Sequence, residues 1–327
     1  METLAAVLTA LLLGKPVIRQ LAKRNICQTI YTYAPETHRT KEGTPTMGGV
    51  LILLGVLSGV ALYAMHPEKR YALPLMMAIF TGALLFALIG LVDDDLIRRW
   101  KGQRGLEWRT KLILQAFAGT FCLWLMAQIP PQLQNALPPA SGFKGSWLGW
   151  VIGLGWLIGW VNAFNLTDGL DGLAGGLAVI AFGALSVIAH EVGVNELSLL
   201  WAGATLGYLW WNTHPAKVFM GDTGSMALGA SFGMLTWREL HATPAPTTFA
   251  TLILLGGVFA VEVLTVIVQL SAVKTLKRRV FKATPIHHHF ELLGWREPQI
   301  VVRFWIIGAL CALGALLLSQ AWRGSHV

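Results

Sequence analysis

Residues 72–95 read ALPLMMAIFTGALLFALIGLVDDD, and this stretch decides the class of fold. From Ala72 to Val92 it holds no charged residue, and three consecutive aspartates follow at once. A helix needs about 20 apolar residues to cross the hydrocarbon core of a bilayer, whereas a surface helix of a soluble protein carries a polar face. The stretch therefore predicts a membrane-spanning helix that ends in a cluster of acids.

The rest of the chain extends this pattern. Hydrophobic residues make up 54% of the 327 residues and charged residues only 13%, about half of the roughly 25% that is usual in soluble domains. Residues 51–65 and 251–273 form further long apolar runs. We therefore expect an all-α, polytopic integral membrane protein with a single transmembrane domain over residues 1–327.

Ten helical spans fit the hydropathy, and they cover residues 3–22, 46–65, 72–92, 110–129, 147–165, 172–190, 197–212, 219–237, 247–273 and 299–320. The connecting segments alternate between two sides, one with 16 Lys and Arg residues and the other with 5. Since positively charged loops stay in the cytoplasm, the richer side is predicted to be cytoplasmic and both termini to lie outside.

Several other classes of protein are excluded. The net charge of +8 could suggest nucleic-acid binding, but the basic residues gather in particular loops, where they set topology and face anionic headgroups. Cys27, Cys122 and Cys311 are too widely spaced to indicate a disulfide framework or a cysteine metal site. The apolar stretch 4–13 lacks a preceding basic residue and a cleavage site, so it predicts a retained first helix.

Two acidic clusters lie at the predicted cytoplasmic ends of spans. Asp93, Asp94 and Asp95 follow the span quoted above, where the negative end of the helix dipole disfavours acids. Residues 165–173 read NLTDGLDGL, in which Asp168 and Asp171 share one face if the segment is helical. Ionisable residues at a membrane helix are costly, so each cluster is a candidate functional site, although a solvated helix end and a structural turn remain open for them.

Two further polar segments lie on the same side. Residues 212–225 contain Asn212 and then FMGDTGS, where Asp222 opens a helix either as a plain N-cap or beside N–H groups that suit phosphate. Residues 287–289 are three histidines, which cannot all face one zinc ion from one helix. Glu262 and Gln269 interrupt the ninth span seven residues apart and therefore share a face.

Together these residues indicate a cytoplasmic site rich in carboxylates with basic residues around it. Mg²⁺ prefers carboxylate oxygens together with substrate phosphates, and phosphoryl or phosphoglycosyl transfer depends on positioning and charge neutralisation. No GxxxxGK[ST] motif is present in the sequence, so ATP hydrolysis is not supported.

The motifs resemble those of the phospho-N-acetylmuramoyl-pentapeptide transferases, within the superfamily that moves N-acetylhexosamine-1-phosphates onto polyprenyl phosphates. The matching strings, which span nearly the whole chain in order, are GTPTMGG (43–49), VDD (92–94), NLTDGLDGL (165–173), NTHPAKVFMGDTGS (212–225) and PIHHHFELLGW (285–295). The resemblance implies transfer from UDP-N-acetylmuramoyl-pentapeptide to undecaprenyl phosphate, giving lipid I and UMP. It also implies Mg²⁺, a homodimer and the bacterial cytoplasmic membrane.

Carried onto this sequence, the family pattern implies a metal ligand, Asp222, and catalytic residues Asp93, Asp94, Asp222, His287, His288 and His289. It implies substrate-binding residues Lys41, Lys111, Asn165, Asp168, Gly169, Leu170, Asp171, Asn212, Phe219 and Gln269. This chain departs from many relatives at Asp95, where they have Tyr, and at Ile97, where several have Lys.

Two alternatives stay open at this point. One is a transferase for another UDP-N-acetylhexosamine, which would share the aspartate motifs. The other, from a different class, is a secondary transporter whose acids would be ion sites. Transporter carboxylates lie near the bilayer midplane at broken helices, whereas the acids here cluster at predicted helix ends.

Overall fold

The structure is a computed structural model, and it describes residues 1–27, 41–96, 105–129, 146–243 and 245–324, with the side chains at 69, 95, 96, 192 and 322–324 left aside. The predictions that concern Ile97 and the side chain of Asp95 lie outside the described residues. The elements are α1 (Glu2–Lys23), α3 (Gly49–Ala64), η1 (Pro67–Ala72), α4 (Leu73–Leu91), η2 (Val92–Leu96), α6 (Trp108–Ala127), α7 (Trp147–Thr167), α8 (Leu173–Ile188), α9 (Val192–Asn212), α10 (Gly221–Ala242), α11 (Pro246–Leu255), α12 (Gly257–Leu276), α13 (Ile286–Glu291) and α14 (Glu297–Gly324).

The described chain is all-helical, which confirms the predicted fold class; its one extended pairing is an isolated bridge between Cys27 and Pro45. Within the described residues, six helices are long and apolar enough to cross a membrane, namely α1, α4 with its flanks, α6, α7, α12 and α14. Shorter apolar helices, α3, α8 and α11, pack among them. The chain is thus built as a multi-pass membrane protein, while the count of ten crossings and the outward placement of both termini stay predictions.

Helix α10 forms the centre of the bundle. It is buried along nearly its whole length and packs most extensively against α4 and α7. Small residues make this close approach possible: a Cβ added at Gly229 would lie 2.6 Å from the Cα of Val161, and one at Gly224 would lie 2.6 Å from the Cα of Gly49. Buried interiors are closely packed, so α10 is held at a fixed depth and orientation.

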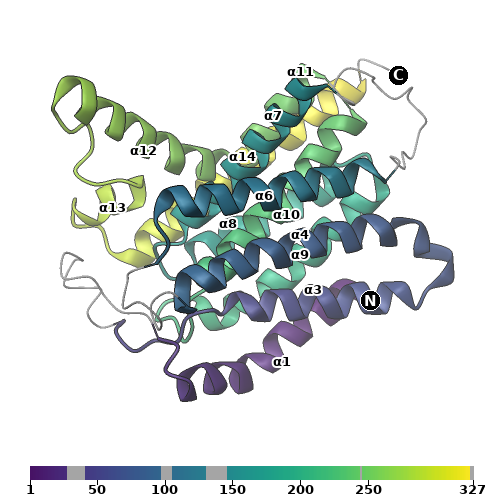
Figure 1. The fold of residues 1–327 in the computed structure, drawn as a ribbon, viewed down its shortest axis with the longest axis horizontal. Helices are drawn as coiled ribbons and strands as arrows, with labels where there is room; N and C mark the ends of the chain where they lie inside the picture. Colours follow the sequence, from purple (N-terminus) through teal and green to yellow (C-terminus); the bar gives the residue numbers. More distant parts are fainter. Residues whose placement is uncertain (28–40, 97–104, 130–145, 244, 325–327) are drawn as a thin grey trace.

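The ninth predicted span, 247–273, is divided in the structure. Helix α11 ends at Leu255 and α12 begins at Gly257, with Gly256 between them. The ring of Trp160 lies where a side chain at position 256 would be, 2.2 Å from its Cβ position. Figure 1 shows α12 leaving the bundle at an angle from this break, with α13 beneath it. A helix can change direction here because adjacent glycines form a weak point for continued helix.

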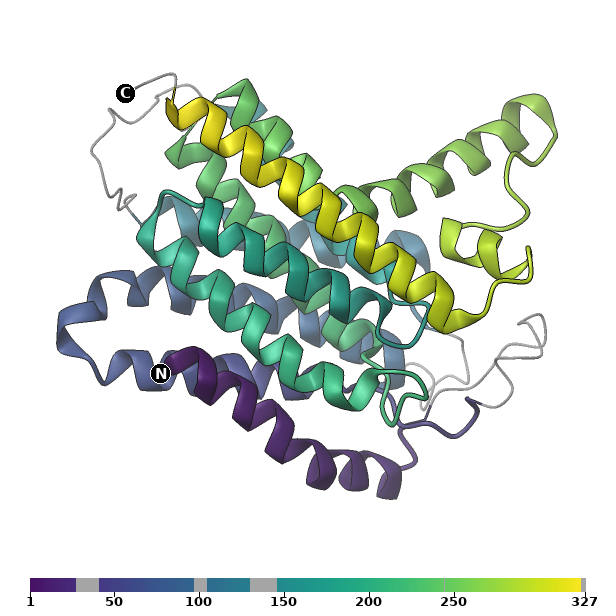
Figure 2. The same cartoon turned by 180° about the vertical axis from the view of Figure 1, so that it is seen from behind.

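The start of α1 and the end of α14 lie toward the same end of the bundle, and the turns that carry the predicted site residues lie toward the other end (Figures 1 and 2). Figure 2 shows α14, in yellow, running along the outside of the bundle over α8, a contact that the packing confirms. Residues far apart in the sequence therefore meet at one polar end.

Candidate active site

Four elements bring one set of polar side chains together. Asp93 and Asp94 lie in η2 directly after α4, Lys111 lies in the first turn of α6, Asn165 in the last turn of α7, and Asp222 in the first turn of α10. Because α4 and α7 both pack against α10, their polar ends converge. All five residues were predicted from the sequence, and we refer to them as the aspartate–lysine cluster.

Lys111 joins the acids of this cluster. Its Nζ lies 2.5 Å from Oδ2 of Asp222 and 2.8 Å from Oδ2 of Asp93. The Nζ also donates to Oδ1 of Asn165 at 3.3 Å. The amide of Asn165 in turn donates to Oδ1 of Asp222 at 2.8 Å and to Oγ of Ser225 at 3.0 Å. Both oxygens of Asp222 are thus oriented, and charge-assisted bonds of this kind fix geometry strongly.

Asp94 caps the N-terminus of α10. Its Oδ1 accepts from the backbone N of Asp222, and its Oδ2 accepts from the N and the Oγ1 of Thr223, each at 3.2 Å. The first N–H groups of a helix need partners, and a negative charge is favourable there. Asp222 itself lies inside the first turn, after the N-cap Met220, so it is not the N-cap. The N–H groups expected to suit a phosphate are occupied by Asp94 in this arrangement.

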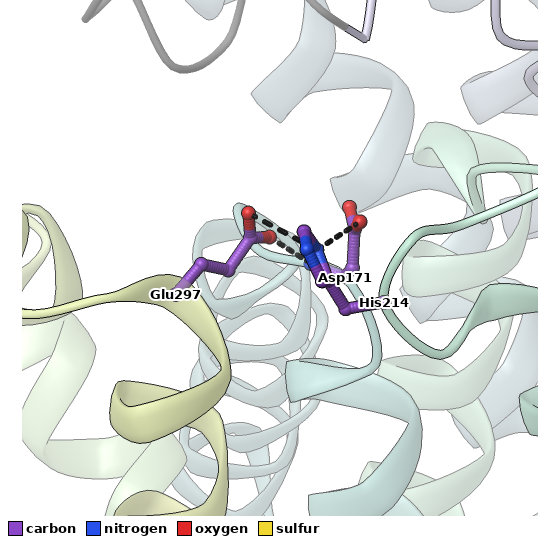
Figure 3. A group of neighbouring side chains, drawn as sticks. All are labelled: Asp171, His214 and Glu297. Carbon is purple, nitrogen blue, oxygen red and sulfur yellow. Dashed lines mark hydrogen bonds and ion pairs between the residues drawn. The ribbon is translucent and has the colours of Figure 1, made fainter.

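A second cluster lies beside the first and consists of Lys41, Asp171, His214 and Glu297; we call it the Lys41 cluster. Nζ of Lys41 lies 2.8 Å from Oδ1 of Asp171 and 2.5 Å from Oε1 of Glu297. Oδ2 of Asp171 lies 3.1 Å from Nδ1 of His214 and accepts from the N of Ala216 at 3.1 Å. Figure 3 shows His214 between the two carboxylates.

Charges in the Lys41 cluster compensate one another. Burial opposes the charged form of Lys41, but the carboxylates of Glu297 and Asp171 outweigh it and raise the pKa of Lys41. Burial alone would raise the pKa of Asp171, yet the hydrogen bond from Lys41 lowers it below its ordinary value. Both residues are therefore charged at neutral pH.

The predicted substrate residues around this cluster support its loops. Oδ1 of Asn212 accepts from the N of Gly172 at 3.1 Å, and its Nδ2 donates to the O of Val218 at 2.9 Å, which ties two loops together. The ring of Phe219 lies 5.9 Å from Nζ of Lys41 and is partly exposed. The side chain of Leu170 belongs to the apolar core, so only its backbone faces the loop surface.

Asp168 lies between the two clusters. Burial raises the pKa of its carboxyl group, and the nearby charges of Asp222, Asp94 and Asp171 raise it further. This carboxyl group therefore holds a proton more readily than an ordinary aspartate does. A nearby cation would reverse that shift.

The histidine segment forms a short helix, α13, and its three side chains have different partners. His287 is fully buried, with Nδ1 3.1 Å from Oε1 of the buried Glu262. Its other nitrogen faces Gly169, where an added Cβ would lie 2.3 Å from Nε2. His288 pairs with Glu291 of its own helix at 2.6 Å, and Nδ1 of His289 accepts from the N of Lys282 at 3.1 Å.

Gln269 holds the chain that leads to α13. Its Oε1 accepts from the N of Val280 at 2.9 Å and of Phe281 at 3.0 Å, and its Nε2 donates to the O of Phe281 at 3.0 Å. Glu262 and Gln269 are both on the buried face of α12, as their spacing predicted. One face of α12 therefore holds His287, which lies against Gly169, and the chain that leads to α13.

Sequence reasoning missed four residues: Ser225 and Thr223, which bond to the aspartate–lysine cluster, and His214 and Glu297, which belong to the Lys41 cluster. The first two lie within the quoted GDTGS string, and His214 lies within NTHPAK, so their motifs were noticed but not their roles. Glu297 had no local signal, because its partner Lys41 is 256 residues away in the sequence.

Among the described residues, one group of side chains has donor atoms close enough together for a metal ion, and it belongs to the Lys41 cluster. One oxygen or nitrogen each from Asp171, His214 and Glu297 lie within 4.8 Å of one another, but the ammonium of Lys41 already bridges the two acids. In the aspartate–lysine cluster, Asp93, Asp94 and Asp222 outnumber the single ammonium of Lys111. This excess of negative charge favours a cation at the cluster, but both oxygens of Asp94 already accept hydrogen bonds from the start of α10.

The sequence is similar to known transferases over most of its length. A family model described as glycosyl transferase family 4 matches residues 76–238, which include the aspartate–lysine cluster. A second model, described as phospho-N-acetylmuramoyl-pentapeptide-transferase signature 1, matches residues 41–53, which begin at Lys41.

Similar proteins bear the name phospho-N-acetylmuramoyl-pentapeptide-transferase. The one from Shouchella clausii is 40% identical over 317 residues, covering 93% of this chain and 92% of the relative. The one from Rubrobacter xylanophilus is 38% identical over 317 residues, with the same coverage of 93% and 92%. That from Desulforapulum autotrophicum is 39% identical over 338 residues, covering 96% of this chain and 90% of the relative.

Proposed function

Because this chain belongs to the phospho-N-acetylmuramoyl-pentapeptide transferase family, we propose that it moves phospho-N-acetylmuramoyl-pentapeptide from its UDP-linked precursor to undecaprenyl phosphate. The products are lipid I, a precursor of peptidoglycan, and UMP. The observation that carries this proposal is the aspartate–lysine cluster, in which Lys111 and Asn165 orient both oxygens of Asp222 at the polar end of a membrane bundle. A charged site at a helix end can receive a water-soluble donor and a membrane acceptor together.

Mg²⁺ is part of the proposal, with Asp222 as its ligand. The fit rests on the chemistry of the donors, because carboxylates in this cluster outnumber the ammonium of Lys111. When bound there, Mg²⁺ would neutralise negative charge on the diphosphate and on the departing UMP. Lys111 lies between two acids, so it can turn toward substrate phosphate once a cation compensates those acids.

The transfer is proposed to be direct. Asp93, held by Lys111 and by the backbone N of Leu106, orients the acceptor phosphate or takes its proton. An oxygen of that phosphate forms a bond to the β-phosphorus of the donor, and the bond from the β-phosphorus to the bridging oxygen breaks. The electron pair of the broken bond leaves with UMP. A covalent aspartyl-phosphate is less favoured because the lipid phosphate is already an ionised nucleophile.

The nucleoside side of the donor is assigned to the neighbouring loops. Asp168, Gly169 and the backbone of Leu170 lie in one loop with Asp171, and Lys41 and Phe219 lie beside it. Asn212 supports these loops through Gly172 and Val218, and Gln269 supports the chain that leads to α13. The three histidines are assigned to the sugar-phosphate region, with His287 supporting Gly169 from behind.

Family membership also supports three finer parts of the proposal. These are undecaprenyl phosphate as the acceptor, the bacterial cytoplasmic membrane as the location with the site facing the cytoplasm, and a homodimer as the assembly. The basic bias of the predicted cytoplasmic loops supports the orientation.

The experiment that tests the function measures UMP release by detergent-purified protein. UDP-N-acetylmuramoyl-pentapeptide, undecaprenyl phosphate and Mg²⁺ are supplied to the wild type, to Asp222→Ala, and to a control, Glu68→Ala, whose side chain is 67% exposed and distant from the site. We expect lipid-dependent release by the wild type and the control that stops with EDTA and in Asp222→Ala. Turnover of UDP-N-acetylglucosamine instead would identify the alternative transferase, and no release from intact substrates would refute the proposal.

A further inference from the structure

One carboxylate ties together three loops of the polar end. Oε1 of Glu297, in the first turn of α14, lies 2.5 Å from Nζ of Lys41 and accepts from the N of Asp171 at 2.7 Å. Its Oε2 lies 3.7 Å from Nδ1 of His214. Lys41 and Asp171 lie 256 and 126 residues before Glu297 in the sequence. Glu297 is therefore a cross-link between α14 and the loops.

Burying these charged groups has a high desolvation cost, which a purely structural contact would not require. The side chains of Glu297, Asp171 and Lys41 are 12%, 3% and 13% exposed, so two acids share one ammonium almost out of water. Desolvation offsets much of the attraction in such a group, and apolar residues of similar size would often stabilise the fold as well. The positive end of the α14 dipole favours an acid at position 297, but it does not explain why this acid contacts Lys41 and Asp171. A role in positioning explains the arrangement better.

The contacts of Glu297 fix two features that a nucleotide would meet. By accepting the N–H of Asp171 it holds the peptide that links Leu170 to Asp171, and so the end of the 168–172 loop. By binding Lys41 it holds the ammonium next to the ring of Phe219. A flat ring beside a fixed cation and a rigid backbone is suited to a planar base.

We infer that Glu297 is a positioning residue for the nucleotide part of the donor: it holds Lys41 and the 168–172 loop in the binding arrangement without touching the substrate. The inference rests on the proposed function and deepens it. His214 completes the support, since its ring lies between the carboxylates of Glu297 and Asp171 (Figure 3). No contact that the described residues make joins Glu297 to the aspartate–lysine cluster directly, so the acceptor phosphate should be unaffected.

The test separates the two substrates. Steady-state kinetics are measured with each substrate varied in turn for the wild type, Glu297→Gln, Glu297→Ala and a matched control, Gln299→Ala, which is exposed in the same turn of α14. For Glu297→Ala we expect the KM for the UDP-linked donor to rise about tenfold or more, with kcat changed less than about threefold. Glu297→Gln keeps an acceptor oxygen, so its donor KM should lie between those of the wild type and Glu297→Ala. The KM for undecaprenyl phosphate should not change in either.

A second readout needs no turnover. UMP binding, measured by titration calorimetry without lipid, should weaken in Glu297→Ala by about the same factor as the donor KM. If Glu297→Ala does not fold, a cycle of Lys41→Met, Glu297→Gln and the double variant decides. Positioning through Lys41 predicts that the double variant binds UMP no worse than Lys41→Met alone.

Equal rises in both KM values, or a fall in kcat with unchanged donor KM and UMP affinity, would overturn the inference. In the double-mutant cycle, additive losses of UMP affinity would also overturn the inference. Failure of the proposed function is distinct from these results, because the wild type itself would then show no lipid-dependent release of UMP.

Discussion

Substituting Gly90 with alanine should damage the site without touching any of its side chains. Gly90 lies in the last turn of α4, three residues before Asp93. An added Cβ would lie 2.3 Å from the carbonyl carbon of Asp222, 2.4 Å from its oxygen and 2.4 Å from the N of Thr223. Carbon contacts are ordinarily about 3.5–4.0 Å, so α4 and α10 would have to separate by roughly 1 Å.

The expected magnitude follows from that displacement. Asp94 accepts from the backbone N of Asp222 and of Thr223 at 3.2 Å, and roughly 1 Å more would take both distances beyond hydrogen-bond range. Overpacking typically costs about 1–3 kcal/mol, and a 1 Å misplacement of catalytic groups can cost about 10²-fold in rate. We therefore expect kcat to fall about 10²-fold and the thermal midpoint in detergent to drop.

A matched control lies in the same pair of helices. Gly82→Ala, also between α4 and α10, would meet Met234 and Cys122 only through side-chain atoms, at 2.5–2.9 Å, and a flexible methionine can move. It should keep most of the activity. Normal turnover by Gly90→Ala, or equal losses in both variants, would refute the argument that backbone packing between α4 and α10 sets the geometry of the site.

Three further predictions concern charges. Lys111→Met should abolish measurable turnover and lower the thermal midpoint. The loss of stability should be smaller than the about 3–5 kcal/mol expected for a fully buried pair, because the lysine keeps 16% exposure. Mg²⁺ should raise the midpoint of this variant more than that of the wild type, and an equal rise would contradict the assignment of the flanking acids. His287→Leu should destabilise the protein by leaving Glu262 buried without its partner. Adding Glu262→Leu should restore part of the lost stability. Additive losses of stability in denaturant titrations would contradict the pairing of the two residues. Because the pKa of Asp171 is lowered in the folded state, the stability that this carboxylate contributes is present above its unfolded pKa of about 3.9 and is lost as pH falls through the folded value. The difference in thermal midpoint between the wild type and Asp171→Asn should therefore be constant from about pH 5 to 9 and shrink below about pH 4. A difference that grows in acid would contradict the ion pair with Lys41.

Features that depend on local spacing could be predicted from the sequence. The uncharged run before Asp93 is long enough to span a membrane, and the structure has a helix there. Glu262 and Gln269, seven residues apart, share the buried face of α12 as predicted. Both follow from helix geometry alone. The break of the ninth span at Gly256 was missed, because glycine in a helix is tolerated until a neighbour such as Trp160 fills the adjacent space.

Features that depend on tertiary packing could not be predicted in this way. The sequence suggested that the acids after α4 were unfavourable at a helix end, but Asp94 caps the start of α10, 128 residues later, where a negative charge is favourable. Glu297 gave no signal because its partners lie in distant loops. The family pattern implied a catalytic role for all three histidines, but nothing in the sequence indicated that His287 is fully buried behind Gly169.

The most direct test of the central claim follows the β-phosphorus. Donor labelled with ³²P at the β-position is incubated with purified protein, undecaprenyl phosphate and Mg²⁺, and the organic, aqueous and protein fractions are counted separately. The account predicts that the label moves to the lipid fraction, that the released UMP is unlabelled, and that no labelled protein accumulates when the lipid is omitted. Label that stays in water, appears in UMP or is trapped on the protein without acceptor would contradict direct transfer at the aspartate–lysine cluster.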